Sequence, residues 1–184
     1  MPITDYELVQ QCLAGQDDAF AELVGRYKNL LGKVIYNLIN NQDELSDLLQ
    51  EVFIKIYKSL RQYNPEYPFA AWCKRIAANH CLDQLRKRKP SLVSLEESPE
   101  IYEQENHPEE EYLKREMQLK MRKTLNGLPE KYRVPIVLYH QNGLSYEEIT
   151  SMLGLPMTVI KNRLYRGRLM LREVLLNSET EVFQ

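Results

Sequence analysis

Apolar residues recur at spacings of three and four along most of this chain, and that periodicity constrains its fold more than any other feature. The clearest run lies between 45 and 60, where the apolar set is Leu45, Leu48, Leu49, Val52, Phe53, Ile56, Tyr57 and Leu60. Such a stripe predicts a helix that buries one face over four turns. The sequence lacks the sustained apolar alternation of a strand, so we predict an all-α protein.

Three stretches of different composition divide the chain. Residues 1–89 and 113–184 carry the helical periodicity, whereas 90–112 hold three prolines and many glutamates but no Lys or Arg. Charge of one sign with few apolar residues is typical of an extended linker; an acidic segment that mimics a nucleic-acid strand is the alternative. We therefore expect two small helical domains, 1–89 and 113–184, joined by an acidic flexible linker over 90–112.

Local signals mark where several helices begin and end. Thr4 with Glu7, and Ser145 with Glu148, fit the capping box, in which two residues satisfy each other's free backbone amides. Gly154 suits the left-handed conformation that ends a helix and closes a tight turn.

Pro135 interrupts the helix expected from Leu128 to about Tyr139. Proline lacks a backbone N–H, and its ring clashes with the preceding turn. We therefore expect a kink here, with the carbonyl of Lys131 unpaired.

The last two expected helices form a helix-turn-helix pattern, because apolar residues face inward on both sides of the Gly154 turn. Recognition helices contact base edges through their N-terminal residues and phosphates through flanking Lys and Arg. The base-edge candidates are Thr158, Val159, Lys161 and Asn162. The phosphate candidates are Arg163, Arg166 and Arg168. An ordinary charged surface helix is the alternative, but capping, turn and charge together favour DNA.

A second candidate nucleic-acid surface follows residue 60, where aromatic residues flank prolines before a helix expected over 69–89. Aromatic rings stack on unpaired bases, and a basic groove follows the phosphates of single-stranded DNA. The loop candidates are Tyr63, Asn64, Tyr67, Phe69 and Trp72. The candidates further along the helix are Asn79, Asp83, Arg86 and Arg88. The alternative is that Phe69 and Trp72 pack in the core, and Trp72 can do both.

Enzyme and metal-binding classes find little support in the sequence. Cys73 and His80 are seven residues apart on one expected helix, about 10 Å along its axis. Even with Cys81 nearby, that pair does not share a zinc ion without further ligands. A Gly-rich phosphate loop is absent. We expect no catalysis, no metal and no cofactor.

Charge and cysteine usage indicate the setting. The formal net charge is −2, so nucleic-acid binding depends on local charge rather than on the overall balance. The three cysteines show no CxxC pairing and no signal peptide precedes them, which favours a reduced cytoplasmic setting. No apolar run has membrane-spanning length, so we expect no direct membrane insertion, and any membrane link passes through a partner.

These motifs together resemble the extracytoplasmic-function (ECF) group of the bacterial sigma-70 family of RNA polymerase sigma factors. Residues 43–53 (DELSDLLQEVF) look like region 2.2, which docks on the clamp helices of RNA polymerase. Residues 69–79 (FAAWCKRIAAN) resemble regions 2.3 and 2.4, which melt and read the −10 element. Residues 128–133 (LPEKYR) and 144–149 (LSYEEI) look like region 4, which reads the −35 element.

The resemblance implies binding to core RNA polymerase and to promoter DNA, as a duplex at −35 and as a single strand at −10. It implies that the loop over 63–68 holds a flipped base, and that an anti-sigma factor masks the polymerase-binding surfaces. It assigns polymerase docking to Asp47, Gln50, Glu51 and Ile54. The start of the recognition helix departs from the family pattern, because Met157 stands where family members usually carry Gly.

Two other function classes remain open. A stand-alone helix-turn-helix regulator would bind duplex DNA tightly without polymerase. A protein-interaction adaptor would use the basic helices to bind an acidic partner, and competitor DNA would displace that partner.

Overall fold

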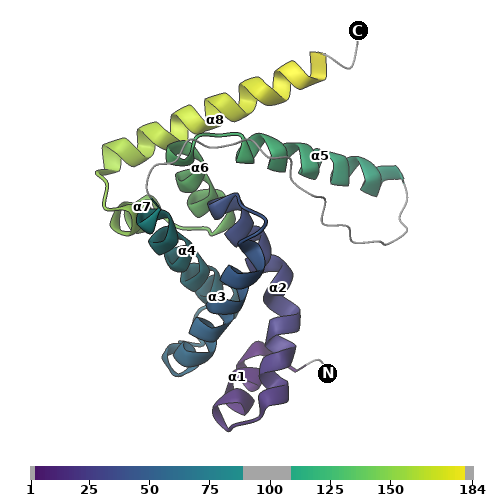
Figure 1. Ribbon diagram of the computed structural model, residues 1–184, viewed down its shortest axis with the longest axis vertical. Helices are drawn as coiled ribbons and strands as arrows, with labels where there is room; N and C mark the ends of the chain where they lie inside the picture. The colour runs from purple at the N-terminus through teal and green to yellow at the C-terminus, as the bar shows by residue number, and fades with distance from the viewer. Residues whose placement is uncertain (1–2, 89–108, 181–184) are drawn as a thin grey trace. The chain divides into compact units, whose positions relative to one another are not determined.

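The computed structural model describes residues 3–88 and 109–180, and every regular element in these ranges is helical (Figure 1). The chain forms two compact units, one mainly from residues 1–90 and the other mainly from 91–184. The predicted all-α class is therefore confirmed. None of the helices in the described ranges is long and apolar enough to cross a membrane.

The first unit is built around its longest helix. Its elements are α1 (Asp5–Leu13), α2 (Asp17–Ile39), α3 (Leu45–Ser59), the short 3₁₀ segment η1 (Leu60–Gln62) and α4 (Phe69–Lys87). Helix α2 packs against α1, α3 and α4. The buried aliphatic residues of α2 include Leu31, Val34, Ile35 and Leu38, so this helix supplies the centre of the core that the other three cover.

The capping box predicted at the start of this unit is confirmed, and residues with a left-handed backbone follow α1 and α2. The backbone N–H of Thr4 donates to the Glu7 carboxylate at 2.8 Å, and the N–H of Glu7 donates to the Thr4 hydroxyl at 3.3 Å. Gly15 follows α1 with φ +86°, and Asn40 ends α2 in the left-handed conformation with φ 55°. These residues suit positive φ because glycine lacks a Cβ and asparagine tolerates that region.

The second unit holds α5 (Glu109–Asn126), α6 (Glu130–Ile136), the π-helical segment η2 (Val137–Gln141), α7 (Tyr146–Leu153) and α8 (Met157–Thr180). Helix α5 begins at Glu109, earlier than the expected start at Leu113. Most of the linker predicted over 90–112 lies outside the described residues. The exact limits of the two domains and the linker therefore stay predictions.

Pro135 lies inside α6, as expected from the helix predicted around it. The sequence predicts a kink at the proline; in the structure the irregular turn begins at Val137, after the last residue of α6, where η2 winds as a π-helix. A π-turn is one of the few ways in which a helix absorbs a break in its hydrogen-bond ladder.

Gly167 allows α8 to cross α6 at short range. A Cβ built at this position would lie 2.5 Å from Cδ1 of Ile136 and 3.4 Å from Cβ of Tyr132. Ile136 is buried, so its side chain has little room to move away. The two helices therefore approach as closely as they do because residue 167 has no side chain.

We predict that Gly167→Ala destabilises the protein by about 1 kcal/mol, since overpacking outweighs the helix propensity that alanine adds. In an Ile136→Val background, which removes Cδ1, the same change becomes neutral or stabilising. Thermal unfolding followed by circular dichroism measures both effects. Equal effects of Gly167→Ala in the two backgrounds would show that contact with Ile136 is not what the glycine avoids.

Candidate docking and nucleic-acid interfaces

Helix α3 separates its residues into a buried stripe and an exposed polar face. Leu48, Val52 and Ile56 are buried. The four predicted docking residues are all exposed, namely Asp47, Gln50, Glu51 and Ile54. Ile54 is 47% exposed although it is apolar, so it is the apolar member of this otherwise polar set. This exposed set, the docking face, is thus available to a partner.

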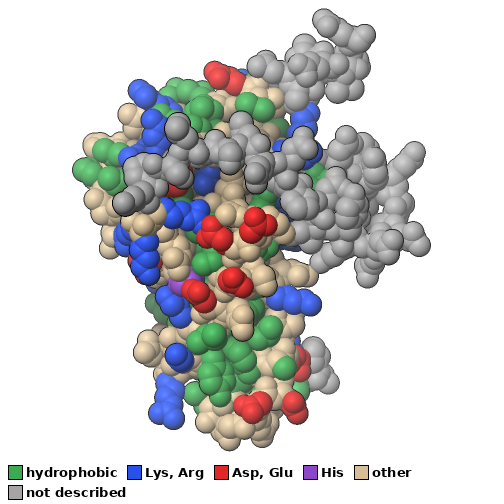
Figure 2. Space-filling model, viewed as in Figure 1, with side chains coloured by type: hydrophobic (Ala, Val, Ile, Leu, Met, Phe, Trp, Pro, Cys, Tyr) green, Lys and Arg blue, Asp and Glu red, His purple; other side chains and the backbone are tan. Residues whose placement is uncertain are grey.

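Hydrophobic side chains also gather elsewhere on the surface of the first unit, as the green area in Figure 2 shows. The large apolar side chains exposed in this unit include Tyr57 on α3 and Leu13 on α1. Tyr57 was expected within the buried stripe, but its ring packs edge-on against Phe20 of α2 at 4.8 Å and stays accessible.

Glu51 has a partner inside the protein that the sequence did not reveal. Its carboxylate lies 2.8 Å from Nε2 of His80 on α4. The His80 side chain is 5% exposed and that of Glu51 is 53% exposed. Burial lowers the pKa of His80, Lys55 lowers it further, and Glu51 opposes both effects. Through Glu51, the docking face thus contacts the buried imidazole of His80, whose lowered pKa favours the neutral form of the ring.

The aromatic loop after η1 is held by its own hydrogen bonds. The Tyr63 hydroxyl donates to the carbonyl of Tyr67 at 2.8 Å. The Asn64 side chain accepts the backbone N–H of Glu66 and donates to the Glu66 carboxylate, both at 3.0 Å. Tyr67 is 64% exposed, so the ordered loop presents one large aromatic ring to solvent.

Phe69 occupies a different position from the one predicted for a DNA contact. Its side chain is 3% exposed, and its ring centroid lies 5.1 Å from Tyr63, 5.5 Å from Trp72 and 5.3 Å from Tyr27. Its ring is thus the centre of an aromatic cluster and does not face solvent. Trp72 and Tyr63 are half-buried, so both can pack in the cluster and still offer an edge to a base.

The predicted polar and basic residues of α4 are exposed. They are Asn79, Asp83, Arg86 and Arg88. Arg86 pairs with Asp83 at 3.3 Å, and Arg88 pairs with Glu44, the residue that precedes α3. Arg88 therefore has an internal role besides the phosphate contact predicted for it.

The helix-turn-helix has the expected form. Ser145 and Glu148 make both hydrogen bonds of the capping box, and Gly154 ends α7 with φ 64°. The carbonyl of Pro156 accepts the N–H groups of Val159 and Ile160 at 3.0 and 3.1 Å, so Pro156 stands at the N-terminal cap of α8. Thr158 thus lies within the first turn and does not cap the helix.

The predicted DNA contacts on α8 differ in exposure. Thr158, Lys161 and Asn162 are exposed, whereas Val159 and Arg163 are half-buried. The inward residues Ile160 and Leu164 of α8 are buried, and so is the inward residue Ile149 of α7. The helix therefore presents polar N-terminal residues and basic residues on one accessible side.

Two arginines of α8 contact aromatic neighbours that no motif in the sequence pointed to. Arg166 hydrogen-bonds to the Tyr132 hydroxyl and thereby lowers the pKa of Tyr132. Arg168 donates from Nε to Nε2 of His140 at 3.2 Å and lies 5.2 Å above the ring of Tyr139. Burial and the charge of Arg168 lower the pKa of His140, which keeps Nε2 available as an acceptor.

Comparisons with known proteins match both units. The model of Sigma-70 region 2 matches residues 23–90, and that of Sigma-70 region 4 matches residues 118–171. The chain is 34% identical over 167 residues to ECF RNA polymerase sigma factor SigE of Mycolicibacterium smegmatis, covering 89% of this chain and 64% of SigE. The chain thus spans less than two thirds of that relative.

Two further proteins match over nearly their whole length. ECF RNA polymerase sigma factor SigW of Bacillus subtilis is 33% identical over 176 residues, which cover 91% of this chain and 94% of SigW. The structure of CnrH in complex with the cytosolic domain of CnrY matches with a TM-score of 0.56 and 26% identity, covering 93% of this chain and 96% of that one.

The buried histidine of the first unit predicts a pH dependence. The folded state lowers the pKa of His80, so the unfolded state takes up the proton first as the pH falls through about 6.5. The free energy of unfolding should therefore fall between pH 7.5 and 5.5, and His80→Gln should reduce that fall. Urea unfolding followed by fluorescence of Trp72, the single tryptophan, reports on the first unit.

Glu51→Gln is the matched variant, because removing the carboxylate that raises the pKa of His80 should make the loss of stability steeper. An unchanged pH dependence in both variants would mean that the proton taken up on unfolding belongs to other groups.

Proposed function

This chain belongs to the ECF group of the sigma-70 family of RNA polymerase sigma factors, and from that membership we propose how its surfaces start transcription. We infer that it binds core RNA polymerase through the docking face, reads the −35 element as a duplex through α8, and opens and reads the −10 element through the aromatic loop and α4. The observation that carries the proposal is that all three surfaces are exposed in one chain that matches regions 2 and 4.

The chemistry of each surface fits the DNA state assigned to it. The accessible side of α8 combines Lys161 and Asn162 with the arginines, which suits base edges and phosphates of duplex DNA. The loop combines the exposed ring of Tyr67 with Asn64, and the half-buried Trp72 packs against Tyr63 of the same loop. Stacking on such rings offsets the cost of taking a base out of the duplex.

We further propose that the protein catalyses no reaction of its own and needs no cofactor, because nucleotide addition is the chemistry of the polymerase. Its place of action is then the cytoplasm, where polymerase and promoter DNA meet.

Control by an anti-sigma factor follows from the same surfaces. CnrH was solved in complex with the cytosolic domain of CnrY. We propose that a partner of this kind covers the docking face of this chain and competes with polymerase for it. Removal of that partner would then switch transcription on.

Run-off transcription with bacterial core polymerase on a library of promoter sequences tests the proposed function. Transcripts that appear only with this protein, from a shared pair of upstream elements, are the expected result. Retention of library duplexes by the protein alone, without transcripts, would favour the stand-alone regulator instead. If neither occurs, a protein-interaction adaptor becomes the better account, and competitor DNA in a pull-down would identify it.

Charge inversion at Asp47 should weaken core polymerase binding by about tenfold or more, because it replaces attraction at an interface with repulsion. Asp47 is preferable to Glu51 for this test, since Glu51 also contacts His80. Fluorescence titration of labelled Asp47→Lys with core polymerase measures the change. Asp18→Lys, an equal charge change at an exposed position of α2, should bind as the wild type does; equal losses in both variants would reject the docking face.

Arg163→Ala should weaken binding to all promoter duplexes and reduce the slope of log affinity against log salt by about 0.9, the value for one lost phosphate contact. The measurement is duplex binding by the protein assembled with core polymerase at several salt concentrations. Arg172→Ala, at an exposed position of α8 further from its N-terminus, is the control. A changed sequence preference in Arg163→Ala would instead make Arg163 a base-reading residue.

A further inference from the structure

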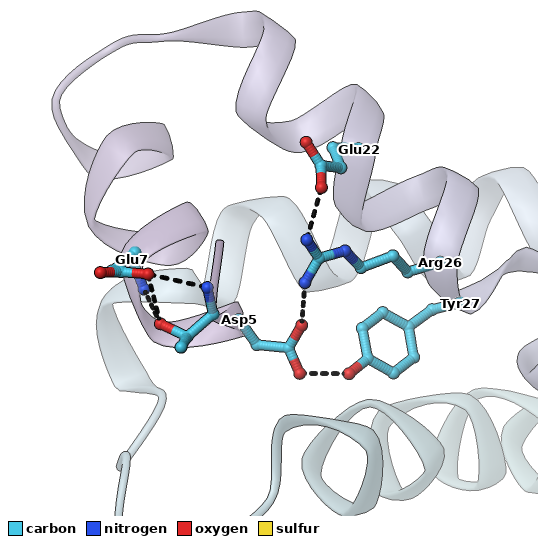
Figure 3. Close-up of polar contacts among 6 residues, drawn as sticks. Asp5, Glu7, Glu22, Arg26 and Tyr27 are labelled. Atoms are coloured by element: carbon cyan, nitrogen blue, oxygen red, sulfur yellow. Dashed lines mark hydrogen bonds and ion pairs between the residues drawn. The ribbon is translucent and has the colours of Figure 1, made fainter. Parts of the chain in front are cut away.

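Helix α1 precedes the segment that matches region 2, which begins at residue 23, and its residue Asp5 contacts α2 within that segment. Asp5 accepts a hydrogen bond from Nη1 of Arg26 at 3.0 Å and another from the hydroxyl of Tyr27 (Figure 3). Arg26 also pairs with Glu22 at 2.5 Å. Asp5 is thus held by two donors from α2, one charged and one neutral.

Tyr27 connects this carboxylate to the aromatic cluster. Its ring meets Phe69 edge-on, with centroids 5.3 Å apart and planes at 65°. Phe69 in turn contacts Tyr63 and Trp72. Burial raises the pKa of Tyr27, and the hydrogen bond to Asp5 raises it further, so the phenol keeps its proton and acts as the donor.

The charge of the Asp5 carboxylate also affects Tyr63, a residue of the aromatic loop. Helix α1 packs against η1, from which the loop leaves. After burial, the charge of Asp5 is the next cause that raises the pKa of Tyr63. One carboxylate therefore lies near two of the rings that surround Phe69, and its hydrogen bond fixes the orientation of one of them.

We propose that Asp5 is a positioning residue for promoter opening: through Tyr27 it fixes the ring of Phe69, and so the places of Tyr63 and Trp72, on which an unpaired −10 base stacks. This inference rests on the proposed function of the aromatic loop. It extends that function to α1, which neither touches DNA in this scheme nor belongs to the matched region.

The rings of the aromatic cluster stabilise one another only in particular relative orientations, so a shift of one ring affects the others. Without Asp5 the half-buried Tyr27 hydroxyl has lost its acceptor, and a polar group in that position turns toward water to recover one. Its ring then leaves the edge-on contact with Phe69, and the cluster no longer holds the loop rings in a single arrangement.

The test measures opening of the −10 region by holoenzyme, using a promoter from the library with 2-aminopurine as the fluorescent base. Asp5→Ala should slow opening by about three- to tenfold, the range for loss of one hydrogen bond. Tyr27→Phe leaves no hydroxyl to turn toward water, so it should open near the wild-type rate and should recover most of the rate in the double variant with Asp5→Ala. Affinity for core polymerase and for the −35 duplex should not change.

Two controls separate positioning from the stability of α1. Thr4→Ala removes the capping box of α1 but keeps the Asp5–Tyr27 bond, so opening should stay at the wild-type rate. Asp5→Asn keeps an acceptor oxygen for the Tyr27 hydroxyl and should restore most of the rate. Equal slowing by Thr4→Ala and Asp5→Ala, or a double variant that opens as slowly as Asp5→Ala alone, would overturn the inference.

Failure of this inference is distinguishable from failure of the proposed function. If wild-type holoenzyme opens the promoter and Asp5→Ala opens it at the same rate, only the role of Asp5 is lost. If wild-type holoenzyme opens no promoter, the proposed function itself fails, and the inference with it.

Discussion

Burial of the apolar stripe of α3 decides which residues of that helix can meet a partner. An α-helix repeats about every 3.6 residues, so packing Leu48, Val52 and Ile56 into the core turns Asp47 and Glu51 outward. Helix α8 follows the same rule: its inward aliphatic residues are buried and most of its polar and basic residues are exposed. Each helix thus stabilises the fold with one face and leaves the other exposed, and these exposed faces are the ones that we propose for polymerase and DNA.

Features that depend on neighbouring residues could be predicted from the sequence. The capping boxes at Thr4 and Ser145 and the left-handed Gly154 need only residues within one turn of each other, and the structure has all three. The all-helical class and the two domains follow from the same periodicity. Recognition of the family needed more, namely several motifs in a fixed order, and both family models match accordingly.

Contacts between distant residues could not be predicted in this way. The pairing of Glu51 with His80, and that of Asp5 with Tyr27, join different helices, and no spacing in the sequence signals either one. Phe69 shows the same limit, because its neighbours resemble a DNA-melting motif while its ring lies in the core. Phe69 instead packs against Tyr63 and Trp72, the rings that we propose for DNA contact.

The central claim is that one chain reads DNA in two states, as a single strand in the first unit and as a duplex in the second. Run-off transcription by holoenzyme from promoters with intact and with premelted −10 DNA tests it most directly. Premelting should restore much of the transcription lost in Tyr67→Ala but leave the defect of Arg163→Ala unchanged. Equal responses of the two variants to premelting would contradict it.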